Sequence, residues 1–97
     1  MGNLTNNADS VVLLSAVVAT GEGDWFKLPV NKVFTVSGIT TATVDIEFRT
    51  HGSDTASVAH SFTADGSQAN SDALYEVRAN VSAWTSGTIT VTACGMI

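Results

Sequence analysis

Apolar and charged residues alternate strictly between positions 44 and 49 of this chain. The apolar members are Val44, Ile46 and Phe48, and the charged members between them are Asp45, Glu47 and Arg49. Successive side chains of a β-strand point to opposite faces, so a period of two predicts a strand with one face on a core and the other in water. We therefore expect the face that carries Asp45 and Glu47 to be exposed to solvent.

Short segments of the same kind recur along most of the chain. Alternating or β-branched segments lie at residues 11–18, 32–37, 57–63, 74–81 and 88–94, and turn-forming or polar segments at 20–24, 51–54, 64–73 and 82–87 separate them. Such spacing, with no amphipathic helix pattern, is typical of antiparallel β-proteins. The sequence predicts an all-β fold, an antiparallel β-sandwich or small barrel of about six to eight short strands.

The pattern also predicts how these segments are connected. Gly38 is expected to end the strand at 32–37, and residues 64–73 are expected to form a polar loop. Two hairpins are expected, 44–50 with 57–63 and 74–81 with 88–94. Three sets of residues are expected to share a strand face: Val58, His60 and Phe62; Tyr75, Val77, Ala79 and Val81, with Tyr75 in the core; and Ile89, Val91 and Ala93. Residues 1–10 read as a flexible N-terminal arm, and residues 11–97 as a single β-sandwich domain.

The charge content is low and acidic. Only 13% of the residues are charged, and the net charge is −5. The four cations, Lys27, Lys32, Arg49 and Arg78, are scattered, so no basic stripe is present and nucleic acid is not an expected partner. The apolar run from Val11 to Ala19 is far shorter than the roughly 20 residues that span a bilayer, so no membrane partner is expected.

Low charge also suggests assembly. The few charges gather on one strand face and in turns, and other faces are covered by Thr and Ala. The single cysteine, Cys94, rules out an internal disulfide framework, and small domains without such staples often gain stability by oligomerising. Interface cores are depleted in charge, so these neutral faces suit packing against further copies or against a shell of protein.

No metal or cofactor site is expected. His51 and His60 would need Asp54 or Asp65 as further ligands, but the spacing matches no zinc motif. The acidic loop at residues 65–72 lacks the alternate ligand positions of a calcium loop, so a solvated turn is the expected structure.

Catalysis is not expected either. Asp45 and Glu47 lie about 6.8 Å apart if they are alternate residues of one strand, a distance that glycoside hydrolysis permits. That chemistry needs a cleft, and an exposed strand face beside Arg49 does not supply one. Cys94 lies near the end of a strand, without a neighbouring base to activate it. We therefore expect a protein that is not an enzyme, and a hydrolase using Asp45 and Glu47 is the least favoured alternative.

The candidate partner-binding residues are three aromatic residues and two residues of the N-terminal arm. Trp84 lies near the tip of the expected turn at 82–87, and Trp25 and Phe26 lie beside an expected edge strand. Exposed aromatic side chains anchor partner proteins or stack on sugars. Leu4 and Asn6 of the arm are expected to order on a neighbouring subunit.

Several stretches together resemble small structural proteins of tailed bacteriophages. They are residues 19–26 (ATGEGDWF), 33–38 (VFTVSG), 42–47 (ATVDIE), 75–81 (YEVRANV) and 86–91 (SGTITV). The resemblance spans roughly residues 11–94 and carries no catalytic motif, so no functional residue is transferred by it. It implies a small β-sandwich built into the virion.

The role that the resemblance most suggests is capsid decoration, or cement. A protein of this kind is made in the host cytoplasm, sits on the outer capsid surface, usually as a homotrimer, and clamps neighbouring major capsid proteins. The alternative is a receptor- or glycan-binding module of the tail or a tail fibre, which would use Trp84, Trp25 and exposed Thr or Asn side chains.

Overall fold

The protein is an all-β, antiparallel structure. A computed structural model describes residues 8–52 and 55–96, and among these residues there is no helix. The strands are β1 (Ala8–Val17), β2 (Gly21–Glu22), β3 (Asn31–Arg49), β4 (Ser57–Phe62), β5 (Gly66–Asn70) and β6 (Glu76–Met96). The predicted fold class is confirmed. Residues 8–10, predicted as part of the arm, begin β1, and residues 1–7 lie outside the described part.

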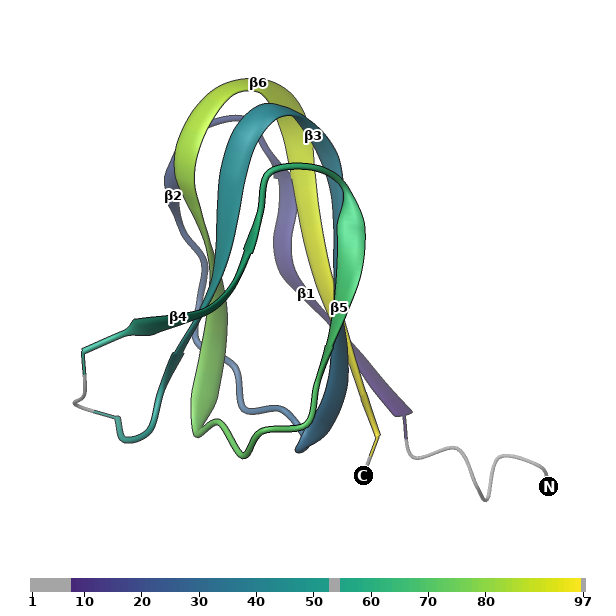
Figure 1. Ribbon diagram of the computed structural model, residues 1–97, viewed down its shortest axis with the longest axis vertical. Helices are drawn as coiled ribbons and strands as arrows, with labels where there is room; N and C mark the ends of the chain where they lie inside the picture. Colours follow the sequence, from purple (N-terminus) through teal and green to yellow (C-terminus); the bar gives the residue numbers. More distant parts are fainter. Residues whose placement is uncertain (1–7, 53–54, 97) are drawn as a thin grey trace, which may run out of the picture.

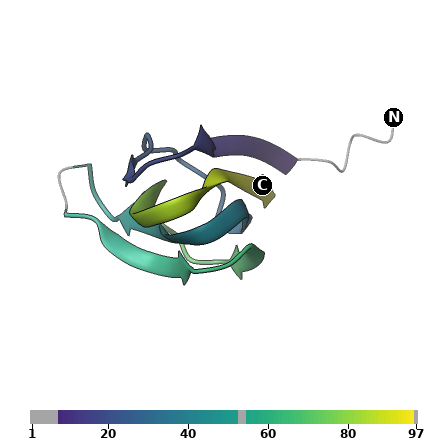
Figure 2. The same cartoon turned by 90° about the horizontal axis from the view of Figure 1, so that it is seen from above.

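Two long strands, β3 and β6, form the centre of the molecule. They pair antiparallel from Asn31 opposite Met96 to Arg49 opposite Glu76 and arch over together (Figure 1). β1 and β2 pair with β6, and β4 and β5 pair with β3. Seen from above, β1 lies on one side of the central pair, and β4 and β5 lie on the other (Figure 2).

The arch divides this sheet into two layers. The first layer contains β1, the C-terminal half of β6, the N-terminal half of β3, and β5. The second layer contains β2, the N-terminal half of β6, the C-terminal half of β3, and β4. Each long strand therefore contributes one half to each layer of a sandwich.

Two glycines allow the central strands to bend. Gly38 of β3 has a φ of +86°, and Gly87 of β6 has a φ of +123°. A Cβ on Gly38 would lie 1.7 Å from the Thr88 carbonyl oxygen, so the strands approach too closely there for any side chain. The carboxylate of Asp65 accepts a hydrogen bond of 2.8 Å from the Ile39 N–H just after the bend.

The bend corrects two predictions about strand connections. Gly38 does not end a strand, because β3 continues through it to Arg49. Residues 74–81 and 88–94 do not form a hairpin, because the strand residues of both segments belong to β6 and each half pairs with β3. The positive φ that would close a turn instead tilts a continuous strand into the other layer.

The core lies between the two layers. Its fully buried members include Phe34 and Val36 of β3, and Ile89 of β6. The alternation at 44–49 is confirmed on its apolar side, since Val44 and Ile46 are buried and Phe48 packs against the core. The expected faces Val77, Ala79 and Val81, and Ile89, Val91 and Ala93, are also buried.

Tyr75 was expected in the core and is not there. It precedes β6, its side chain is 42% exposed, and its ring stacks on that of His51. The Lys27 ammonium lies 4.9 Å from the ring centre. The alternating face begins only at Val77, because the chain before Glu76 has not yet entered the sheet.

The remaining differences between the sequence-based predictions and the structure lie in strands β4 and β5. The hairpin of β3 with β4 is confirmed, but a register shift after Ile46, which pairs with His60, places Val58 opposite Glu47. Val58 is therefore not on the face of His60 and Phe62, and it is 54% exposed. The expected loop at 64–73 contains β5, which pairs with β3 from Lys32 opposite Asn70 to Val36 opposite Gly66.

Candidate interaction surface

The outer face of the second layer carries a network of paired charges. Glu47 accepts hydrogen bonds from Arg78 Nε at 2.7 Å and from Asn80 Nδ2 at 3.0 Å. Arg78 also bonds the carboxylate of Glu22 at 2.8 Å, and Arg49 pairs with Glu76 at 2.6 Å. Glu47 was expected to be exposed but is only 9% exposed, and its carboxylate is held by Arg78 and Asn80.

Trp25 lies over this network. The guanidinium carbons of Arg49 and Arg78 are 4.3 Å and 4.4 Å from the centre of its ring, so cation–π contacts hold the indole on the sheet. The next residue, Phe26, exchanges backbone hydrogen bonds of 2.8 Å with Val77 and packs against the core. Both aromatic residues therefore attach the segment after β2 to the second layer.

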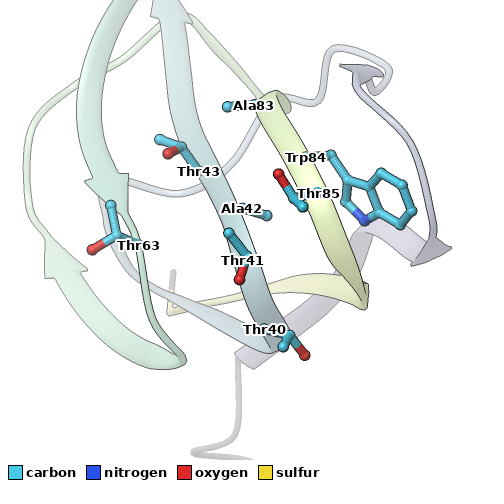
Figure 3. Close-up of a pocket in the computed structure, with 8 residues that line it drawn as sticks. All are labelled: Thr40, Thr41, Ala42, Thr43, Thr63, Ala83, Trp84 and Thr85. Atoms are coloured by element: carbon cyan, nitrogen blue, oxygen red, sulfur yellow. The ribbon is translucent and has the colours of Figure 1, made fainter.

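Trp84 lies elsewhere, near the arch. Its Nε1 donates a hydrogen bond of 3.0 Å to the Gly87 carbonyl, and its ring packs against the core. It also lines an open hollow of about 310 Å³ that is bordered mainly by threonines of β3 and β6, with Thr63 (Figure 3). The indole extends from β6 away from Thr40 to Thr43 on β3. Trp25 and Trp84 thus belong to different parts of the molecule, and Leu4 and Asn6 lie outside the described residues.

The carboxylates considered for catalysis already have partners. Asp45 accepts a hydrogen bond of 2.7 Å from the Ser61 hydroxyl, and Glu47 is held by Arg78 and Asn80. Neither carboxylate lines the threonine-rich hollow near the arch.

The residues considered for metal binding are not brought together. His51 stacks on Tyr75 at a turn, His60 contacts Asn70 inside the sandwich, and Asp65 bonds the backbone at the arch. Within residues 8–52 and 55–96, no group of three His, Cys, Asp or Glu side chains is placed to hold a metal ion. Asp54 is outside this part of the chain.

The outer face of the first layer is the contrasting surface. Register places Ser10, Cys94, Val33 and Ala69 in one row across four strands, and Val12, Thr92, Thr35 and Ser67 in the next, followed by Thr90 and Ser37. None of these residues is charged, and most of them are exposed, including Val12 at 53% and Val33 at 40%. We call this surface the uncharged face.

Sequence reasoning found only part of this surface. The abundance of Thr and Ala indicated neutral faces, but it could not show that four strands align theirs. The sequence of β5 gives no clear strand signal, because four of its five residues are exposed and only Asn70 is buried, so the segment is easily read as a loop.

Comparisons of the chain with protein-family models, with curated proteins and with solved structures give no match. The described residues form no helix that is long and apolar enough to cross a membrane.

Proposed function

We propose that this protein is a non-enzymatic structural protein of a phage virion, most specifically a capsid decoration or cement protein that stabilises the head by binding major capsid proteins. The observation that carries this proposal is the uncharged face of the first layer. A broad, exposed, neutral surface on an acidic molecule resembles the charge-depleted core of an interface.

The distribution of charge supports the same function. The charged side chains of the second layer pair with one another across β2, β3 and β6, two arginines with three glutamates, so they have little need of an external partner. The uncharged face contains short hydroxyl and β-branched side chains, which lose little conformational entropy when they are covered. Its hydroxyls need hydrogen-bond partners on burial, so the complementary surface must be neutral and partly polar.

In this function the uncharged face lies against neighbouring capsid proteins, and the second layer, with its paired charges, points away from the shell. A net charge of −5 disfavours contact with packaged DNA and suits the outer capsid surface. The resemblance to phage structural proteins further supports a homotrimer, in which copies made in the host cytoplasm associate on the head.

The proposal is tested on heads assembled with and without the protein. Heads that lack it are expected to rupture at a lower temperature and at a weaker osmotic shock, and images of intact virions are expected to show its density outside the shell. Unchanged rupture of the deficient heads, or density confined to the tail, would contradict a cement function.

One observation favours the alternative of a glycan- or receptor-binding module in the tail. Trp84 is one of the residues that border the threonine-rich hollow, although its indole extends away from the threonines of β3. The ring is already packed and hydrogen-bonded, which weakens this alternative. Glycan-array binding that is lost in Trp84→Ala would support it over cement.

A further inference from the structure

A partly buried polar contact joins the two edge strands that pair with β3. His60 of β4 belongs to the second layer, and Asn70 at the end of β5 belongs to the first. Asn70 Nδ2 lies 3.0 Å from His60 Nε2, and Asn70 is only 9% exposed. This contact links β4 to β5, although the two strands are not paired with each other.

The orientation of the Asn70 amide determines which nitrogen of His60 carries a proton. Asn70 Oδ1 accepts a hydrogen bond of 2.8 Å from the Asp72 N–H, so the oxygen of the amide points away from His60. The NH₂ group therefore faces Nε2, and it can only donate. His60 must accept at Nε2, which requires a neutral ring with its proton on Nδ1.

We propose that the His60–Asn70 contact is an acid-sensitive switch, which holds β4 and β5 together when His60 is neutral and releases them when Nε2 gains a proton. Protonation places two donors face to face, so either the imidazolium leaves the interior or the Asn70 amide turns and loses the Asp72 N–H. This inference does not depend on the proposed function.

Charged and aromatic groups surround the His60–Asn70 contact. On β3, Lys32 is 4% exposed and donates hydrogen bonds of 2.8 Å to the Val30 and Asp72 carbonyls, so a fixed ammonium lies in the same region. The carboxylate of Asp72 comes from the segment after β5. The ring centres of Phe34 and His60 are 5.9 Å apart. Asp45 and Glu47 of β3 occupy the opposite face of the sheet.

The direction of titration follows from this environment. Burial lowers the pKa of His60 below its ordinary value of 6.5, the Asp72 carboxylate opposes this shift, and the Lys32 ammonium adds to it. A histidine whose pKa is lowered by folding contributes stability above the pKa of the unfolded chain. That contribution is lost as the pH falls through the folded pKa.

Nitrogen NMR of the imidazole tests the switch directly. At neutral pH we expect Nε2 of His60 to be unprotonated and Nδ1 to carry the proton. A proton on Nε2 at neutral pH would overturn the proposal, because the amide could not then donate to it.

Thermal unfolding between about pH 7 and pH 5 tests the consequence. His60→Gln keeps an acceptor near the position of Nε2 without a titratable group. As the pH is lowered, the unfolding temperature of this variant is therefore expected to fall less than that of the wild type. Asn70→Asp supplies an acceptor for the imidazolium and is also expected to reduce the fall. His51→Gln, a change at the exposed histidine, is the matched control and should behave as the wild type.

An equal fall of the midpoint in wild type and His60→Gln would contradict the switch. If His60→Gln does not fold, the comparison of Asn70→Asp with the wild type, together with the NMR assignment, still decides the question.

Discussion

Glu47 is the residue that departs most from its sequence pattern. A charged residue at an alternate strand position is normally solvated, and alternation alone could not show that Arg78 and Asn80 would cover it from the neighbouring strand. The pairing of Glu47 with Arg78 is a long-range property of the register between β3 and β6. The location of charged residues on one face was predictable, whereas their burial was not.

Glu47→Ala is expected to lower the free energy of unfolding by about 2–3 kcal/mol, because the change removes the more buried of the two carboxylates that bind the Arg78 guanidinium and also removes the acceptor of Asn80 Nδ2. Glu22→Ala removes the other carboxylate that bonds Arg78, but the Glu22 side chain is 55% exposed and the loss should stay below about 1 kcal/mol. Chemical denaturation of both variants measures the difference. Equal losses would show that burial of Glu47 does not govern its contribution.

Ala16 offers a gain in stability. Its φ is +51°, a left-handed conformation that is unfavourable for a residue with a Cβ, and its N–H donates to the Thr90 hydroxyl at 3.2 Å. Ala16→Gly is expected to raise the free energy of unfolding by about 0.5–1 kcal/mol. Ala83→Gly, at an exposed strand position, should lower it by a similar amount. A loss of stability in Ala16→Gly would refute the claim of strain in β1.

At the scale of the elements, the sequence does not show whether Gly38 and Gly87 end a strand or bend it. Gly38 and Gly87 each stand between two well-formed alternating segments, and a positive φ serves a reversing turn and a bend equally well. The strand segments were therefore predictable, but their joining into β3 and β6 was not. The deciding contact is the close approach of the two glycines across the pair, which links residues far apart in sequence.

Gly38→Ala tests the bend. The new Cβ would collide with the Thr88 carbonyl, and the backbone conformation is unfavourable for alanine, so we expect a loss above about 3 kcal/mol or failure to fold. Gly52→Ala is the control, because nothing lies within 4 Å of the added carbon, and its effect should be within about 0.5 kcal/mol. Circular dichroism during denaturation distinguishes these results, and a mild effect of Gly38→Ala would contradict the close packing at the arch.

For the whole molecule, the two outer faces have opposite characters. The second layer carries the paired charges and Trp25, whereas the first layer exposes a neutral surface four strands wide. Low overall charge already indicated assembly. The location of the uncharged face could not be predicted, because it depends on the register between strands. That register places Val33 between Cys94 and Ala69, and no local sequence pattern specifies it.

Val33 and Val58 form a matched pair for testing this contrast. Both are exposed strand valines, at 40% and 54%, but Val33 lies on the uncharged face and Val58 lies opposite Glu47 on the charged one. A lysine at either position should leave the fold intact. Only at Val33 would the new charge be buried by a partner, where it lacks a counter-charge and its desolvation is unfavourable.

The most direct measurement is the affinity of each variant for phage heads assembled without the protein. We predict that Val33→Lys weakens binding at least about tenfold and that Val58→Lys binds within about twofold of the wild type. Equal binding by all three proteins, or a loss confined to Val58→Lys, would contradict the claim that the uncharged face is the surface that docks on the capsid.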